Sequence, residues 1–135
     1  MDCIFCKIAA GEIPSATLYE DEEFRVMLDI GPATRGHALI LPKRHCANIF
    51  ELPDELAQKA FVLAKKTAAA LSRGLEADGV NILQNNGEAA GQTVFHFHMH
   101  VIPRYQGDGL KLGWKTGELG EEEKEKILAS VKAFI

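Results

Sequence analysis

The sequence predicts an α+β fold: an antiparallel sheet, one long helix packed against it and a C-terminal helix. Two observations carry this prediction. Short segments that suit strands come in runs bounded by Gly, Pro and acidic turns, and one long segment between them has apolar residues at helical spacing. Runs of strands around a single long helix favour α+β over repeated strand–helix–strand units. With 135 residues the chain has the usual size of one domain, so we expect a single domain over residues 1–135.

The first half of the chain predicts a short helix and three strands. The helix covers residues 4–10, which are largely apolar and precede a glycine that can end a helix. The strands cover residues 17–19, 24–29 and 37–41. An acidic turn separates the first two strands, and a glycine and a proline bound the third.

The second half predicts two helices and two strands. The segment 53–75 is the clearest helix, because it has a proline and two acidic residues at its start and apolar residues recurring every three or four positions. Strands are predicted over residues 80–84 and 94–103. The segment 121–134 predicts an amphipathic helix whose acidic residues come first, as the helix dipole prefers.

Three of the five histidines alternate with apolar residues within the predicted strand 94–103. They are His96, His98 and His100. On a strand, alternate side chains share a face, so these imidazoles would lie about 7 Å apart while the residues between them enter the core. Imidazole titrates near neutrality, and a row of three can support proton, metal or phosphorus chemistry.

The composition excludes several classes of protein. The net charge is −4, which argues against a broad electrostatic grip on nucleic acid. No apolar run approaches the roughly 20 residues of a membrane helix, and the N-terminus lacks the basic and apolar regions of a signal peptide. We therefore expect a cytoplasmic protein with no nucleic-acid partner and no membrane partner.

The three cysteines leave alternatives open. Cys3 and Cys6 form a C-x-x-C pair, and Cys46 stands apart beside His45. The odd count makes structural disulfides an unfavoured reading. The pair can be half of a metal site, a redox pair or two buried thiols. A redox pair normally follows a strand, and only two residues precede Cys3 here.

Several segments together resemble the histidine triad (HIT) family of nucleotide-binding hydrolases and transferases. The histidine run at 96–102 and the segment 36–43 carry the strongest likeness. The further matching segments, in the family's order, are residues 2–8, 28–32, 85–87 and 91–94. The resemblance covers about residues 2–105 and is greatest to the branch that includes Hint proteins and bacterial HIT proteins.

The resemblance implies a single HIT domain, a fold and a catalytic set. It implies a homodimer whose sheets join across the two-fold axis, with the long helix and the strand 80–84 as dimer elements. The matching catalytic residues are His98 as the nucleophile toward the α-phosphorus, His100 at the phosphate and leaving group, and His37 as the residue that orients the triad. A buried strand histidine is the alternative reading of His37.

The resemblance also implies nucleotide contacts. Asp29 is placed to accept hydrogen bonds from the ribose hydroxyls, although an aspartate before Gly-Pro can equally cap a turn. The residues that match the apolar slot for the base are Ile4, Phe5, Ile8, Met27 and Ile30. The residues that match the phosphate-contacting loop are Asn85, Gly91, Gln92, Thr93 and Val94.

A metal site is the last expectation. Cys3, Cys6, His45 and His96 offer two thiolates and two imidazoles, which suit one structural Zn²⁺ per chain. Some bacterial members of the family carry such a site, and many Hint-like members lack the cysteines. Buried thiols beside a surface histidine are the alternative. No organic cofactor is expected.

These residues predict a nucleotidyl hydrolase. It would cleave a nucleoside 5′-monophosphate, with AMP favoured, from an amine or phosphate leaving group through a nucleotidyl-His98 intermediate. The substrate would be a purine nucleotide. Two alternatives remain open at this point: a dinucleoside polyphosphate hydrolase, and a non-catalytic protein that binds a nucleotide and zinc.

Overall fold

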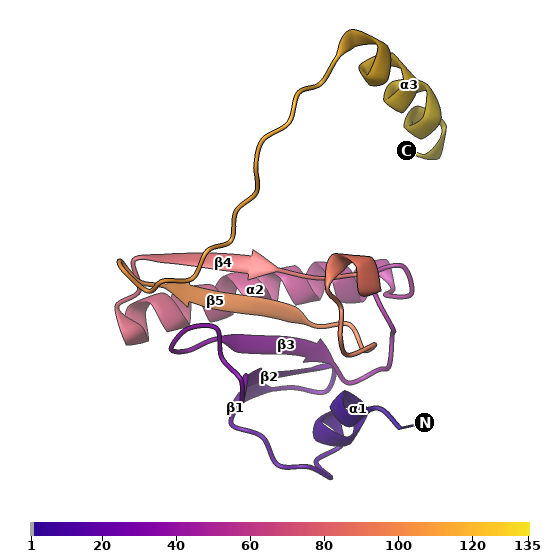
Figure 1. Ribbon diagram of the computed structural model, residues 1–135. Coiled ribbons are helices and arrows are strands. Elements are labelled where there is room, and N and C mark those ends of the chain that lie inside the picture. The colour runs from indigo at the N-terminus through magenta and orange to yellow at the C-terminus, as the bar shows by residue number, and fades with distance from the viewer. Residues whose placement is uncertain (1) are drawn as a thin grey trace.

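A five-stranded antiparallel sheet forms the body of the protein in the computed structural model, which describes residues 2–135 (Figure 1). Met1, the first residue of the predicted domain 1–135, lies outside the described residues. The strands are β1 (Thr17–Glu20), β2 (Phe24–Leu28), β3 (Ala38–Pro42), β4 (Gly79–Leu83) and β5 (Met99–Arg104). Their order across the sheet is β1-β2-β3-β5-β4, and every neighbouring pair is antiparallel. The predicted α+β fold is confirmed.

Three α-helices accompany the sheet. They are α1 (Ile4–Ala9), α2 (Asp54–Leu75) and α3 (Glu121–Val131). Single 3₁₀ turns follow at Glu88–Ala90 and at Lys132–Phe134. The long helix α2 begins after Pro53 and has acidic residues in its first turn, as predicted. It continues through Gly74, and Glu76 ends it in the left-handed conformation with φ 53°.

The two faces of the sheet have separate cores. Alternate residues of β3 divide between them: Ala38 and Ile40 join the cluster under α2, whereas Leu39 and Leu41 join the cluster under α1. Because a strand covered on both faces needs apolar residues at every position, β3 reads as a continuous apolar run. β2 reads as one apart from Arg25, whose guanidinium pairs with Glu20. His100 pairs with Leu39 across β3 and β5, so its side chain belongs to the α1 face.

A close approach between β3 and α2 requires glycine at position 36. Gly36 has φ +90°, and a Cβ atom there would lie 2.3 Å from the Leu75 Cδ1 atom. A side chain at this position would therefore meet both backbone strain and a clash. The turn before β3, which carries the residues around His37, is thereby held against the end of α2.

The prediction of a strand over residues 94–103 is wrong in its first half, because β5 begins at Met99. The backbone before Met99 bonds elsewhere: the Phe97 N–H donates to the Cys46 carbonyl at 2.6 Å, and the His98 ring bonds to the His96 carbonyl at 2.7 Å. The His98 and His100 rings are 5.0 Å apart between centroids, closer than an ideal strand would place them. The three residues predicted to enter the core are buried: Phe97, Met99 and Val101.

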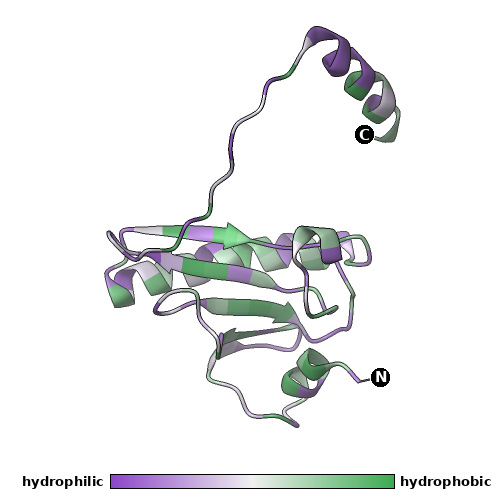
Figure 2. Cartoon of the chain, in the orientation of Figure 1, coloured by the Kyte–Doolittle hydropathy of each residue, from purple (hydrophilic) through white to green (hydrophobic). Residues whose placement is uncertain are grey.

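The C-terminal part leaves the body as an arm, which we define as residues 110–135. Residues 110–120 form no helix or strand, and α3 lies beyond β4, away from the rest of the chain (Figure 1). No residue of α3 is buried, and its apolar residues lie toward its end (Figure 2). Within residues 2–135, no helix combines the length and apolar character that crossing a membrane requires.

Candidate functional site

Two clusters of ionisable side chains adjoin each other on the α1 face of the sheet. The first, which we call the thiol cluster, consists of Cys3, Cys6, His45 and His96. The second, which we call the histidine cluster, consists of His37, His98 and His100. Phe5 of α1 lies between them, since its ring meets those of His96 and His98 edge-on at centroid distances of 6.0 and 4.9 Å.

The thiol cluster brings four ligand atoms within 4.8 Å of one another. The Nδ1 atom of His96 lies 3.5 Å from the sulfur of Cys3 and 3.5 Å from that of Cys6. The His45 Nδ1 atom lies 3.3 Å from the Cys6 sulfur. Ligands about 2.3 Å (sulfur) and 2.0–2.1 Å (nitrogen) from a tetrahedral zinc ion lie about 3.4–3.8 Å from one another, so these sulfur–nitrogen distances suit such an ion.

The orientation of His96 is set by its other nitrogen. Its Nε2 atom lies 2.7 Å from the Pro42 carbonyl oxygen, so Nε2 carries the proton and donates it. The lone pair therefore resides on Nδ1, which faces the two sulfurs. A carbonyl that fixes the tautomer of a ligand histidine is the usual support of a metal site. The four residues can thus hold a metal ion.

His98 shows the opposite arrangement. Its Nδ1 atom lies 2.7 Å from the His96 carbonyl oxygen, so Nδ1–H donates and Nε2 keeps the lone pair. Burial lowers the pKa of His98 from its ordinary value of 6.5, while the bond to the carbonyl opposes that shift. The ring is buried apart from 7% of its surface. Near pH 7 it is a neutral imidazole with one free nitrogen.

His37 and His100 form a hydrogen-bonded pair whose direction the backbone decides. The Ala33 N–H donates to His37 Nδ1 at 2.9 Å, so His37 carries its proton on Nε2. That Nε2 atom lies 2.9 Å from His100 Nδ1, which must accept. His100 is left with a proton on Nε2, available to a further acceptor. Two hydrogen bonds in series, from the Ala33 N–H to His37 and from His37 to His100, therefore leave His100 with a donor at Nε2.

The electrostatics agree with these neutral tautomers. Burial, together with the neighbouring His98 and His37, lowers the pKa of His100 to about 4. Burial also lowers the pKa of His37, against the opposing effect of Asp29. The Asp29 carboxylate lies 3.6 Å from His37 Nε2. All three histidines of the cluster are accordingly neutral at pH 7.

The residues predicted to contact a nucleotide divide into exposed and buried groups. Asp29 is half-buried beside the histidine cluster, and its Oδ1 atom accepts the Gly31 N–H at 2.8 Å. It therefore serves the turn, while its Oδ2 atom lies 3.6 Å from His37 Nε2 and makes no hydrogen bond with residues 2–135. In the apolar set, Ile30 is fully exposed at 100% and Ile4 is exposed at 52%, whereas the others belong to the α1 core. Those others are Phe5, Ile8 and Met27.

The loop 85–94 is held by the side chain of Gln92, which is buried. Its Oε1 atom accepts the Gly87 N–H at 2.8 Å, and its Nε2 atom donates to the carbonyls of Ala47 and Val94. The Gln92 amide thus has protein partners at both ends and shapes the loop. Thr93 and Gly91 are exposed, and Val94 and Asn85 are half-buried beside them.

Several groups that define the site are backbone atoms, and the resemblance implies such a carbonyl for His98 without identifying the residue that supplies it. The Pro42 and His96 carbonyls and the Ala33 N–H fix the tautomers of His96, His98 and His37. Any residue type supplies such atoms, so composition and spacing carry no signal for them. The sequence places the histidines, and the fold decides which nitrogen of each is free.

Comparisons with known proteins agree with this fold. The HIT domain family model matches residues 10–107, which is most of the chain. A crystal structure of a HIT family member from Bacillus subtilis has 48% sequence identity, covers 100% of this chain and 98% of its own, and superposes with a TM-score of 0.92. The extended arm is therefore part of the likeness.

Two further relatives bear on the two clusters. The adenosine 5′-monophosphoramidase HNT1 of Saccharomyces cerevisiae is 44% identical over 93% of this chain and 80% of its own length. A Zn-bound histidine triad family protein from Mycobacterium smegmatis has 41% identity, covers 100% of this chain and 99% of its own, and has a TM-score of 0.78. On the family model and on these identities, the chain belongs to the HIT family.

Proposed function

We propose that the protein is a nucleotidyl hydrolase that releases a nucleoside 5′-monophosphate through covalent attachment to His98. The observation that carries the proposal is the hydrogen bond from His98 Nδ1 to the His96 carbonyl at 2.7 Å. It leaves Nε2 as a neutral nucleophile, which is the form that attacks phosphorus. Relatives named adenosine 5′-monophosphoramidase, 44% and 42% identical to this chain, support AMP as the transferred group and an amine as the leaving group.

In the first step, His98 Nε2 attacks the α-phosphorus and the bond from phosphorus to the leaving nitrogen breaks. Because His37 fixes the tautomer of His100, the Nε2–H group of His100 is available to donate a hydrogen bond to the phosphate. It stabilises the charge that develops on phosphate oxygen or on the leaving group. The amine takes its proton from solvent or from a donor in the site and departs.

In the second step, water attacks the same phosphorus, the bond from phosphorus to His98 Nε2 breaks, and one proton of the water passes to solvent. AMP leaves, and the imidazole returns to its neutral state with the proton still on Nδ1. Because the Nδ1–H bond to the His96 carbonyl persists through both steps, the ring keeps its orientation while it gains and loses the phosphoryl group.

The nucleotide would lie over the exposed residues beside these histidines. Asp29 keeps Oδ2 free for the ribose hydroxyls. Ile4 and Ile30 offer exposed apolar surface for the base, with the buried Phe5, Ile8 and Met27 supporting it from below. The phosphate would meet the N–H groups of the loop 91–94 together with Asn85 and Thr93. The side chain of Gln92 holds this loop in place.

The thiol cluster would hold one structural zinc ion. Its support is the donor chemistry of two thiolates and two imidazoles, the sulfur–nitrogen distances of 3.3–3.5 Å and the fixed tautomer of His96. A bound ion would tie the N-terminal residues to the sheet and leave His98 and His100 for chemistry. The zinc-bound relative from M. smegmatis supports this assignment.

The functional unit would be a homodimer. β4 is the last strand of the sheet and has a free edge, and Phe61 of the neighbouring helix is 60% exposed. An open strand edge beside exposed apolar side chains favours an interface between two copies. We expect β4 and α2 of two copies to meet there across a two-fold axis.

Turnover of an adenosine phosphoramidate tests the proposed function. The wild-type protein should show saturable release of AMP, and His98→Ala should lose nearly all of it while AMP still binds. Loss of a covalent nucleophile costs several orders of magnitude in rate. Retention of more than about a tenth of the wild-type rate in His98→Ala would exclude His98 as the nucleophile. A protein that binds AMP without any turnover would instead be a binding module.

A further inference from the structure

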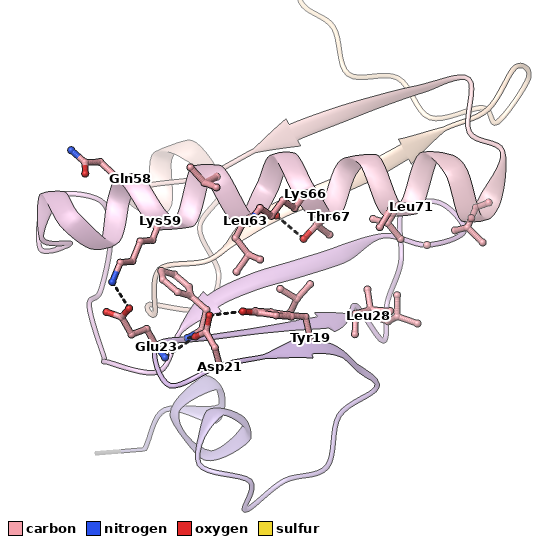
Figure 3. Close-up of a pocket in the computed structure, with 18 of the residues that line it drawn as sticks. Tyr19, Asp21, Glu23, Leu28, Gln58, Lys59, Leu63, Lys66, Thr67 and Leu71 are labelled. Carbon is pink, nitrogen blue, oxygen red and sulfur yellow. Dashed lines mark hydrogen bonds and ion pairs between the residues drawn. The ribbon is translucent and has the colours of Figure 1, made fainter.

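A large groove lies on the opposite face of the sheet from both clusters. It is a groove of about 1070 Å³ between α2 and the strands β1 and β2 (Figure 3). Val26 and Leu28 of β2 line it from the sheet, and Val62 and Ala70 line it from the helix. Leu18 of β1 lines it as well and is 51% exposed. An apolar groove of this size at the surface indicates a binding site.

The groove exists because one helix cannot cover a sheet of five strands. Strands lie about 4.8 Å apart, so the outer strands are about 19 Å apart, whereas a helix is about 10 Å wide. α2 packs on β3, β5 and β4, and Phe24 and Val26 of β2 are buried in the core beneath it. The same face of β1 is left uncovered, since every residue of β1 is exposed. The fold therefore has room for a second helix beside α2.

The chain has one helix without a partner, and it is amphipathic. Ile127, Leu128 and Val131 follow one another at helical spacing and form one side of α3, and none of them is buried. Phe134 continues this side in the next turn and is 88% exposed. Ala129 and Ala133 fall on the opposite side. An isolated helix of this length is only marginally stable in water unless its apolar side is packed.

The position of α3 decides which groove it can reach. The arm leaves the body past the free edge of β4, and α3 lies on that side, whereas the groove of the same chain lies over β1 and β2 (Figure 1). The free edge of β4 is where the proposed dimer places the second copy, so the inference rests on that dimer. We infer that α3 of one copy docks into the groove between α2 and β1–β2 of the other copy, and that the two copies exchange arms.

Length and charge agree with this occupant. Residues 121–134 span about 20 Å as a helix, and the groove runs along α2 from Gln58 to Leu75, about 26 Å. Residues 110–120 reach up to about 36 Å when extended, enough to cross onto a second copy. The charged residues that line the groove are Arg35, Lys59 and Lys66 with Asp21 and Glu23, which leaves an excess of one positive charge. α3 has four glutamates and two lysines, an excess of two negative charges that complements the groove.

Photo-crosslinking tests the exchange in the full-length protein. A p-benzoylphenylalanine at position 131, on the apolar side of α3, should give a covalent dimer whose linked peptide contains groove residues. The same group at position 133, on the opposite side, should give at least fivefold less. Crosslinks from position 131 that stay within one chain would show that α3 folds onto its own body. Crosslinks to other surfaces, or none, would also overturn the inference.

A matched pair of adjacent alanines controls for damage to α2. Ala70 lines the groove and Ala69 does not, and both are exposed. Ala70→Lys should lower the crosslink yield from position 131 by at least fivefold, whereas Ala69→Lys should leave it unchanged. Equal effects of the two substitutions would contradict docking in this groove. Circular dichroism and thermal melting of both variants show whether each has folded.

The dimer dissociation constants of the full-length and the shortened protein distinguish failure of this inference from failure of the proposed dimer. Removal of residues 120–135 should raise the dimer dissociation constant at least tenfold, as measured by sedimentation. A full-length protein that is monomeric at micromolar concentration would refute the proposed dimer itself. A full-length dimer with the same dissociation constant as the shortened chain would leave the dimer intact and refute the exchange of arms. Capture of α3 by a different protein would do so as well.

Discussion

His96 and His98 are two residues apart and have the same side chain, yet they belong to different clusters. In His96 the carbonyl of Pro42 binds Nε2, and Nδ1 faces two cysteine sulfurs. In His98 the carbonyl of His96 binds Nδ1, and Nε2 is free. Each imidazole thus has one nitrogen fixed by the backbone and one nitrogen left for its task.

The difference shows that the backbone, and not the residue type, assigns the role of each histidine. Neutral imidazole is a donor at one nitrogen and an acceptor at the other, so a carbonyl at one position determines the lone pair at the other. The same rule governs His37 and His100, where the Ala33 N–H takes the place of the carbonyl and reverses the direction. The predictions below separate the two clusters by their consequences.

The largest expected effect is a crossed result between His98→Asn and His96→Asn. His98→Asn should lower kcat by several orders of magnitude and leave the zinc content at one per chain. His96→Asn should lose zinc and thermal stability. Steady-state kinetics and elemental analysis of both variants measure this. A His98→Asn protein that loses zinc, with wild-type turnover, would mean that the two roles are exchanged.

The next effect concerns the thiols. Protein purified without added metal should contain about one zinc per chain, and Cys3→Ser/Cys6→Ser should contain almost none. A ligand bound only by the folded state at a hundredfold excess over its dissociation constant adds about 2.7 kcal/mol. In a domain of this size, that loss lowers the melting temperature by about 10 °C. Cys46→Ser is the matched control, since Cys46 lies outside the thiol cluster. Absence of zinc from the wild-type protein, expressed with zinc present, would reject the site.

A smaller loss is expected at His37. His37→Gln removes the ring that links the Ala33 N–H to His100. Because misplacement of a catalytic group by about 1 Å can cost about a hundredfold, kcat should fall by roughly that factor and by less than in His98→Asn. Zinc content should not change. A kcat within twofold of the wild type would show that the orientation of His100 does not depend on His37.

The smallest effect is a pH dependence of stability. The pKa of His100 is about 4 in the folded protein, below its ordinary value of 6.5. Between these values the unfolded chain binds a proton that the folded chain does not, so this contribution is complete above pH 6.5 and is lost as the pH falls toward 4. The two proteins to compare are Cys3→Ser/Cys6→Ser and the same variant with His100→Asn added, because loss of the thiols removes competition between protons and metal. Urea denaturation of each at pH 7 and at pH 5 gives the change in unfolding free energy between the two pH values. That change should be smaller in the protein with His100→Asn. Equal differences would contradict the lowered pKa.

Much of the fold follows from periodicity and boundary residues. The long helix was predictable from its acidic start and regular apolar residues, and its bounds differ by one residue from those observed. The absence of a strand over residues 94–98 was not predictable, because the alternation of residues at 96–101 suits a strand. The backbone there instead bonds to Cys46 and to the His98 side chain. The position of α3 away from the body could not be predicted either. An amphipathic pattern indicates that a helix packs against a partner, and it does not identify the partner.

The candidate site shows the same division. The identities of Cys3, Cys6 and His98 follow from spacing and from likeness to the family. The engagement of both ends of the Gln92 amide within its own loop does not, because a glutamine in a polar loop has the same sequence signature whether it binds a ligand or the backbone.

The tautomers of His96 and His98 test the central claim most directly. Two-bond ¹H–¹⁵N correlation NMR on ¹⁵N-histidine-labelled protein at pH 7 distinguishes a proton on Nδ1 from one on Nε2, with His96→Asn and His98→Asn giving the assignments. We expect His98 to carry its proton on Nδ1 and His96 to carry its proton on Nε2. A spectrum in which His98 is protonated on Nε2 would leave its only lone pair on Nδ1, which faces the His96 carbonyl, and would contradict the account.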